Sequence, residues 1–243
     1  MRHLAGRLAA IPNVLAVTLG GSRATGTATE ASDWDFGLYY RTPIEVADVS
    51  ALGWPGRVFA PGDWGRIVNG GAWLTVEGAR VDLCYRDLGQ VEGWLADAEA
   101  GRFEVQREVG YVAGIATYVP VGELAVGEVL AGSLPRPGFP PALRASAPPV
   151  WANLAAGALS TAAGHAARGD RVACLANAGQ AVLAAAQGRL AAAGEWALNE
   201  KGIVARAGLG ACQDLLAAPA PDLAALVAAL APLLDLPAWG PPG

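Results

Sequence analysis

The feature that most constrains the fold of this chain is an abrupt change of sequence pattern after its midpoint. A stretch rich in proline and glycine, residues 132–149, separates two parts of the 243-residue sequence. Before it, short β-forming runs alternate with helical patterns, whereas after it the chain is rich in Ala and Leu. Because Pro and Gly interrupt helices and strands, we predict one domain over residues 1–135 and a second over residues 150–243.

The second part has the pattern of an all-helical domain. The expected helices span residues 151–168, 171–193, 200–218 and 222–234. Their apolar residues can be buried only against one another, which predicts a C-terminal α-helical bundle. The apolar run 223–234 is too short to cross a membrane and contains Pro232.

The first part mixes strands and helices. The expected strands span residues 14–19, 33–40, 72–76 and 80–85, and the expected helices span 2–10, 44–52 and 87–100. A short turn at residues 77–79 joins two of these strands and suits an antiparallel hairpin. The whole chain is therefore predicted to be mixed α/β, of the α+β class: a small mixed sheet followed by helices.

Three carboxylates stand at informative places on these strands. Period-2 alternation puts Asp33 and Asp35 on one face of their strand, together with Tyr39. Asp82 lies on the face of its strand opposite Val81. Acidic groups gathered in this way repel one another. A divalent cation such as Mg²⁺ relieves the repulsion, since it prefers oxygen ligands and completes its shell with water and phosphate.

A glycine turn follows the first strand and precedes the paired acids. Gly20 and Gly21 carry no side chains, so backbone N–H groups can approach a phosphate. Ser22 and Arg23 come next and are candidate phosphate donors through hydroxyl and guanidinium. The order of these groups predicts a site for a metal-bound nucleotide.

With these motifs the sequence resembles the DNA polymerase beta-like nucleotidyltransferase superfamily. Its signature is a Gly-Ser turn, an Asp-x-Asp strand and a third carboxylate on a later strand, matched here by Gly21-Ser22, Asp33-x-Asp35 and Asp82. The resemblance implies a nucleotidyltransferase domain over residues 1–135 and transfer of a nucleoside monophosphate with release of pyrophosphate. It also implies ATP or another NTP as donor and two Mg²⁺ ions. Asp33 and Asp35 would hold both ions, and Asp82 would bind the second and accept a proton.

The two-domain layout is similar to that of antibiotic nucleotidyltransferases of the aminoglycoside and lincosamide type. That similarity implies a small-molecule hydroxyl as acceptor, and AMP as the group transferred. In such enzymes the helical domain supplies polar groups, so Lys201 is predicted to contact the triphosphate and Glu200 the acceptor. Tyr39, on the acidic side of its strand, is a further candidate for lining the site. A solvent-exposed helix cap is the alternative for Lys201 and Glu200.

Charge and cysteine content limit the partners and the compartment. With a net charge of -5 and a pI near 5.1, the chain lacks the basic surface that long nucleic acids require. Three widely spaced cysteines indicate neither a zinc site nor a disulfide framework. We expect a soluble, cytoplasmic protein without a membrane segment or a signal peptide.

Two other functions are compatible with the same motifs. A nucleotidyltransferase of this type can also modify a protein side chain by AMPylation, although such enzymes are usually shorter. A non-catalytic nucleotide sensor or scaffold is the second alternative, which the presence of all three carboxylates disfavours.

Overall fold

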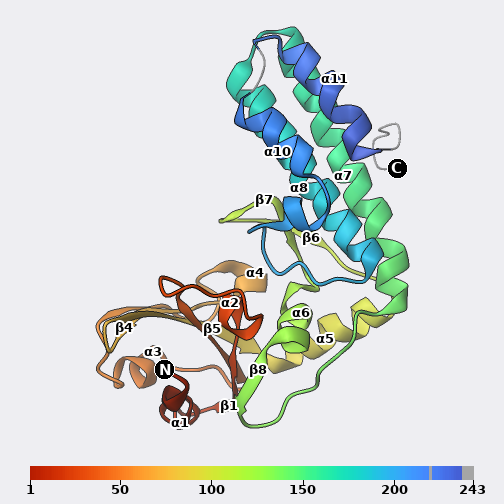
Figure 1. Ribbon diagram of the computed structural model, residues 1–243. Coiled ribbons are helices and arrows are strands. Elements are labelled where there is room, and N and C mark those ends of the chain that lie inside the picture. The colour runs from red at the N-terminus through yellow and green to blue at the C-terminus, as the bar shows by residue number, and fades with distance from the viewer. Residues whose placement is uncertain (219–220, 237–243) are drawn as a thin grey trace. The chain divides into compact units, whose positions relative to one another are not determined.

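The computed structural model describes residues 1–218 and 221–236, and its elements form two compact units (Figure 1). The first unit comprises Met1–Ala96 and Thr117–Gly138, and the second comprises Asp97–Ala116 and the chain from Phe139 onward. The sequence-based boundaries had kept residues 97–116 with the first domain. The parts of the predicted helical domain at 219–220 and 237–243 lie outside the described residues.

The first unit is built on a six-stranded mixed sheet with the strand order β3-β4-β5-β2-β1-β8. Its strands are β1 (Val14–Leu19), β2 (Trp34–Tyr40), β3 (Gly56–Val58), β4 (Gly71–Val76), β5 (Ala79–Asp87) and β8 (Glu128–Ala131). β2 and β5 are parallel, and every other neighbouring pair is antiparallel. The mixed sheet confirms the predicted fold class.

One face of this sheet carries the hydrophobic core. Phe36 and Leu38 of β2 and Leu83 of β5 are fully buried there. Leu8 and Val49, from the helices beside the sheet, belong to the same core. The intervening residues therefore point to the other face, which is the alternation that the sequence predicted for β2 and β5.

Short helices surround the sheet. They are the 3₁₀ turn η1 (Arg2–Leu4), α1 (Ala5–Ala9), α2 (Gly21–Ala24), α3 (Val46–Ser50), α4 (Gly65–Val68) and α6 (Val119–Val126), while α5 (Leu88–Glu99) runs from the first unit into the second. The sequence pattern predicted α1, α3 and α5. It did not predict α4, α6 or the strands β3 and β8, because elements this short leave little periodicity to detect.

The second unit, drawn in the upper part of Figure 1, combines a strand pair with helices. Its elements are β6 (Val105–Glu108), β7 (Tyr111–Ala116), α7 (Pro141–Ala167), α8 (Arg171–Ala193), α9 (Ile203–Arg206), α10 (Gly210–Ala217) and α11 (Leu223–Leu234). The small side chains of Ala155, Ala162, Ala178 and Ala181 are completely buried in α7 and α8. Such residues let helix backbones approach closely, and the predicted C-terminal helical region is confirmed.

Two predictions about these helices were wrong in detail. α7 begins at Pro141, before the predicted start at residue 151, and contains Pro148 and Pro149 in its interior. Buried Leu143, Ala147 and Trp151 flank the prolines, so tertiary packing outweighs the amide hydrogen bonds that the prolines remove. The helix predicted over 200–218 is divided into α9 and α10.

No helix in the described part of the chain combines the length and the apolar character needed to cross a membrane.

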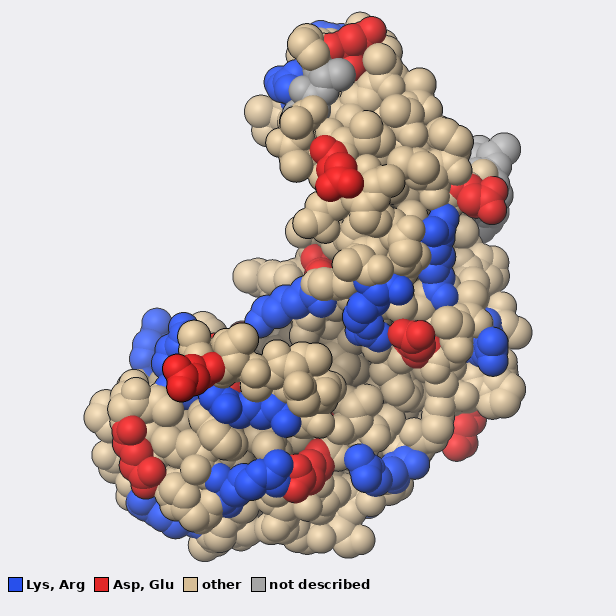
Figure 2. Space-filling model, in the orientation of Figure 1, with Lys and Arg blue, Asp and Glu red and all other residues tan. Residues whose placement is uncertain are grey.

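Acidic and basic side chains are interspersed on the visible face of the first unit (Figure 2).

Candidate active site

Asp35 and Asp82 lie side by side in the middle of the sheet. They are register partners on the parallel strands β2 and β5, so their side chains leave the same face from strands about 4.8 Å apart. Both residues are half-buried, and this face is the one opposite the hydrophobic core. The structure therefore brings together two of the three predicted carboxylates.

The glycine turn packs directly against the first of these carboxylates. The backbone N–H of Gly20 donates to the carbonyl oxygen of Asp35 at 2.8 Å. Gly21 has a φ of +57°, and a Cβ atom there would lie 1.8 Å from Oδ2 of Asp35. Glycine is favoured on both counts, since other residues are strained at positive φ and a Cβ atom would force the Asp35 carboxylate to move. The glycine turn and Asp35 are therefore packed tightly against each other.

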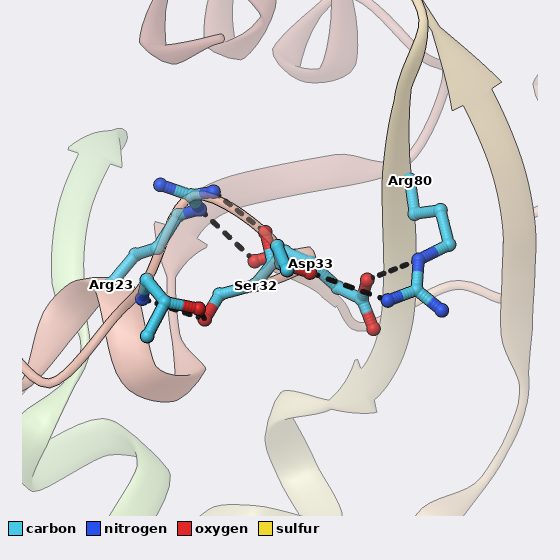
Figure 3. Close-up of polar contacts among 6 residues, drawn as sticks. Arg23, Ser32, Asp33 and Arg80 are labelled. Carbon is cyan, nitrogen blue, oxygen red and sulfur yellow. Dashed lines mark hydrogen bonds and ion pairs between the residues drawn. The ribbon is translucent and has the colours of Figure 1, made fainter.

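Arg23 holds the loop that leads into β2 (Figure 3). Its Nε donates to the carbonyl oxygen of Asp33 at 3.1 Å and its Nη2 to that of Ser32 at 2.6 Å. The guanidinium also lies 4.1 Å from the ring centre of Trp34. These contacts give Arg23 a structural role in placing Asp33, beside the phosphate-binding role predicted for it. Ser22 lies in the same helical turn and is half-buried.

Asp33 is paired with an arginine that the sequence analysis did not single out. Nε of Arg80 lies 2.6 Å from Oδ1 of Asp33 (Figure 3). That oxygen is buried and accepts no hydrogen bond from the described residues, so the contact is a charge pair with poor hydrogen-bond geometry. Arg80 precedes Asp82 by two positions on β5, so strand alternation places both side chains on the same face. This spacing is the sequence signal that could have identified Arg80 as a neighbour of the carboxylates.

The carboxylates match a divalent cation in chemistry but are not gathered into a three-ligand cluster. Within residues 1–218 and 221–236, no group of three His, Cys, Asp or Glu side chains is placed to hold a metal ion. Asp35 and Asp82 supply the oxygen ligands that Mg²⁺ prefers. The third carboxylate, Asp33, is held by Arg80 and retains a buried oxygen without a hydrogen bond. Asp35 and Asp82 therefore fit a divalent cation. Asp33 could become a third ligand only by giving up its contact with Arg80.

A buried ion pair lies farther along the same face of β5. Arg86 is 5% exposed and binds Glu123 of α6 through two contacts, Nε to Oε2 at 2.5 Å and Nη2 to Oε1 at 2.8 Å. Burial acts to lower the pKa of Arg86, but the Glu123 carboxylate outweighs it, so the pKa is raised and the guanidinium stays charged. This pair fastens α6 to the sheet, and the sequence analysis missed it.

Tyr39 lies in this buried region and not in an open pocket. It is 1% exposed, and its hydroxyl hydrogen-bonds to Thr18. Burial, and after it the Glu123 carboxylate, raises the pKa of Tyr39. Burial likewise raises the pKa of Cys84, on the neighbouring strand, to about 11. Both side chains are therefore neutral at pH 7. Because Tyr39 is buried, its hydroxyl has little access to an acceptor.

Glu200 and Lys201 belong to the second unit. The Glu200 carboxylate accepts hydrogen bonds from the backbone N–H groups of Val112 and Ala113 in β7, at 2.8 and 2.7 Å. Lys201 is exposed, and its backbone N–H donates to Oδ1 of Asn199 at 2.9 Å. Glu200 therefore has a structural partner in its own unit, and the substrate contacts expected of both residues stay predictions.

Comparison with known proteins adds independent information about the N-terminal region. Residues 1–60 match the family model described as nucleotidyltransferase domain, and this segment contains the glycine turn, Asp33 and Asp35. None of the curated proteins matches the sequence. One similar solved structure is a nucleotidyltransferase-like protein from Exiguobacterium sibiricum, with 13% sequence identity and a TM-score of 0.46. The alignment covers 96% of this chain and 73% of that one. The family match over residues 1–60 supports a nucleotidyltransferase domain at the N-terminus of the chain, and with it a transferase.

Proposed function

We propose that the protein transfers a nucleoside monophosphate, AMP from ATP, to a hydroxyl group of a small molecule in a metal-dependent reaction that releases pyrophosphate. The observation that carries this proposal is the register pair of Asp35 and Asp82, with the glycine turn packed against Asp35. A phosphate-binding turn beside two carboxylates is the arrangement that a metal-nucleotide complex requires.

Asp35 and Asp82 would hold the divalent cation, and Asp33 would join them by leaving Arg80. The Arg80 side chain is 72% exposed and that of Asp33 is 33% exposed, so Arg80 can move into solvent when it leaves. A cation in its place would supply the positive charge that the buried Oδ1 of Asp33 requires. A divalent cation bound there would lower the charge barrier to attack on the phosphate and stabilise the leaving pyrophosphate.

The protein's own groups account for the remaining steps. The backbone N–H of Gly21 and the Ser22 hydroxyl would bind the phosphates of the donor, while the N–H of Gly20 stays bonded to the carbonyl oxygen of Asp35. The acceptor oxygen forms a bond to the α-phosphorus, the bond between that phosphorus and the bridging oxygen breaks, and pyrophosphate leaves. Asp82 accepts the proton of the acceptor hydroxyl and passes it to solvent.

The experiment is incubation of the full chain with ATP labelled at the α-phosphate, Mg²⁺ and a panel of hydroxylated compounds that includes aminoglycosides and lincosamides. We expect label in a small-molecule product, with an equal amount of pyrophosphate. Asp82→Asn should reduce the rate by about 10³-fold, because it removes both a cation ligand and the proton acceptor. Glu45→Gln, which changes an exposed carboxylate in the same unit, should leave the rate unchanged.

The outcomes separate the alternatives. Label on a co-purifying protein, with none in small molecules, would replace the small-molecule acceptor by a protein side chain. Metal-dependent binding of ATP without any pyrophosphate release would identify a nucleotide sensor and overturn the proposal.

A further inference from the structure

Three aromatic side chains form a cluster on the sheet face that carries the carboxylates. The rings of Trp64 and Trp73 are stacked, with centroids 5.2 Å apart and an interplanar angle of 21°. Phe59 completes the cluster, with ring centroids 5.0 Å from Trp64 and 4.8 Å from Trp73. Trp64 and Trp73 come from different elements, since Trp64 immediately precedes α4 and Trp73 lies in β4.

A glycine in the backbone beneath the cluster leaves space for the Trp64 ring. Gly71 lies two positions before Trp73 on β4, and a Cβ atom there would lie 2.9 Å from Cζ3 of Trp64 and 1.8 Å from the carbonyl oxygen of Leu83. A side chain at this position would displace the Trp64 ring from the sheet. The absence of a side chain at Gly71 therefore allows the Trp64 ring to pack directly against β4.

Trp73 is exposed although its neighbours in sequence are core residues. The residue is 50% exposed, whereas Ala72 and Leu74 are buried in the core on the opposite face. An indole is among the most apolar of side chains, and exposed aromatic groups of this kind are typical of binding sites. A ligand that covers the ring would remove this apolar surface from water.

The sheet register places Trp73 directly beside Asp82. Trp73 and Asp82 are partners on β4 and β5, and Asp82 and Asp35 are partners on β5 and β2. Gly20 bonds to the backbone of Asp35 on the far side of this row. The order across the sheet is therefore the glycine turn, Asp35, Asp82 and Trp73.

This order has a consequence for in-line phosphoryl chemistry. The attacking and leaving oxygens occupy opposite sides of the phosphorus. If the leaving pyrophosphate lies at the glycine turn, the acceptor hydroxyl approaches from the Asp82 side. The rest of the acceptor then lies against Trp73.

We propose that the ring cluster of Phe59, Trp64 and Trp73 is the platform on which the acceptor binds, and that the acceptor presents an uncharged, flat or cyclic apolar face beside its hydroxyl group. This inference rests on the proposed nucleotidyl transfer, whose acceptor class it narrows. On the side of the platform away from Asp82, the nearby positive charge favours an uncharged acceptor over a polycation. Arg57, the register partner of Trp73 on β3, has its guanidinium 4.9 Å from the Phe59 ring centre, and the Arg80 side chain is 72% exposed.

The test compares the full-length chain with Trp73→Ala, Trp73→Phe and the control Thr75→Ala, which changes the next exposed position on the same face of β4. Neutral aryl glycosides, such as p-nitrophenyl glucoside, are the probes, and kanamycin is the polycationic comparison. Calorimetric titration without nucleotide measures binding, and steady-state kinetics with ATP measures the KM of each substrate. Thermal melts establish that each variant is folded.

We expect the wild-type chain and Thr75→Ala to bind the aryl glycosides better than kanamycin. Trp73→Ala should weaken this binding about tenfold or more, as truncation of a central tryptophan typically does, and Trp73→Phe should retain part of it. In turnover, the KM of the acceptor should rise while the KM of ATP stays constant.

Absence of glycoside binding to the wild-type chain, or equal binding to Trp73→Ala, would overturn the platform, as would a rise in the KM of ATP in place of the acceptor. The two proposals fail in different ways. Binding that depends on Trp73 without turnover would refute nucleotidyl transfer and leave the ring site standing. Turnover with an acceptor KM unaffected by Trp73→Ala would refute the platform alone.

Discussion

At the scale of single residues, the candidate site depends on a glycine without substitutes. Gly21 combines a positive φ with a contact that leaves no space for a side chain next to Oδ2 of Asp35. The lack of a side chain lets Asp35 occupy its place, and in the proposed function it would also let a phosphate approach the turn. One residue would then serve both donor binding and the position of a catalytic carboxylate.

Gly21→Ala should therefore cost both stability and activity. We expect a loss of about 1–3 kcal/mol from backbone strain and a lower kcat from displacement of Asp35, measured by chemical denaturation and the pyrophosphate assay. Gly6→Ala is the matched control, because a Cβ atom at Gly6 in α1 meets nothing within 4 Å. Its stability should rise by about 0.5–1 kcal/mol. An active Gly21→Ala enzyme would contradict this account of the turn.

Tyr85 provides a residue-scale test of the core. Its hydroxyl is buried and has no hydrogen-bond partner in the described part of the chain. Burial, followed by the influence of Tyr40, raises the pKa of Tyr85 above that of an exposed tyrosine. The folded state thus holds the proton more tightly than the unfolded state, so stability is retained below about pH 10 and declines as the pH rises toward the folded-state pKa.

Tyr85→Phe should remove both effects. We expect about 1 kcal/mol of added stability at pH 7, because an unsatisfied hydroxyl is no longer buried. The decline of stability above about pH 10 should become shallower, since the contribution of Tyr85 is lost while those of the other buried tyrosines remain. Urea denaturation from pH 7 to 11 measures both quantities. A variant less stable than wild type at pH 7 would reveal a partner for the hydroxyl.

At the scale of elements, α6 is held to the sheet by charge as well as by apolar packing. The side chain of Arg86 is only 6% exposed and that of Glu123 only 29%, so the two charges lie largely out of water. Removing one partner leaves the other charge buried without compensation, which is much more costly than the pair is worth by itself.

Glu123→Gln should destabilise the fold by about 3 kcal/mol or more. The exposed pair of Arg41 and Glu92, at 2.7 Å with side chains 54% and 43% exposed, offers the comparison. Glu92→Gln should change stability by no more than about 1 kcal/mol. Denaturant unfolding of both variants at one pH measures the difference, and equal losses would refute the distinction between buried and exposed pairs.

At the scale of the whole molecule, the chain crosses between its two units more than once. Asp97–Ala116 belongs to the second unit although the chain returns to the first at Thr117. Ile115, 2% exposed, and the Glu200 contacts to β7 show that this strand pair is part of the C-terminal packing. The first unit is therefore not a contiguous segment of the chain.

A chain truncated after residue 138 should expose the strand pair that has lost its partners. We expect strong binding of a hydrophobic dye and aggregation on heating, because buried apolar surface becomes accessible. Replacing residues 97–116 of the truncated chain with a Gly-Ser linker should reduce dye binding and restore a cooperative thermal transition. Dye fluorescence and circular dichroism measure these effects. Equal dye binding by the two chains would place residues 97–116 with the first unit.

The sequence by itself determined the features that depend on local pattern. Residues 14–19, 33–40 and 80–85 form strands, and the alternation of β2 and β5 correctly set Asp35 and Asp82 on the face away from the core, because side chains on a strand alternate whatever surrounds it. The change to Ala- and Leu-rich segments likewise predicted the C-terminal helices. The glycine turn was predicted because Gly20 and Gly21 directly follow a β-forming run, where glycine marks a tight turn.

Only the tertiary structure decided which of these groups meet. The pairing of Asp33 with Arg80 and the place of Trp73 beside Asp82 follow from strand register, and register depends on how strands far apart in sequence align. The continuation of α7 through Pro148 and Pro149 depends on packing that compensates for lost hydrogen bonds. Long-range pairing and burial are properties of the folded chain as a whole, and no local pattern encodes them.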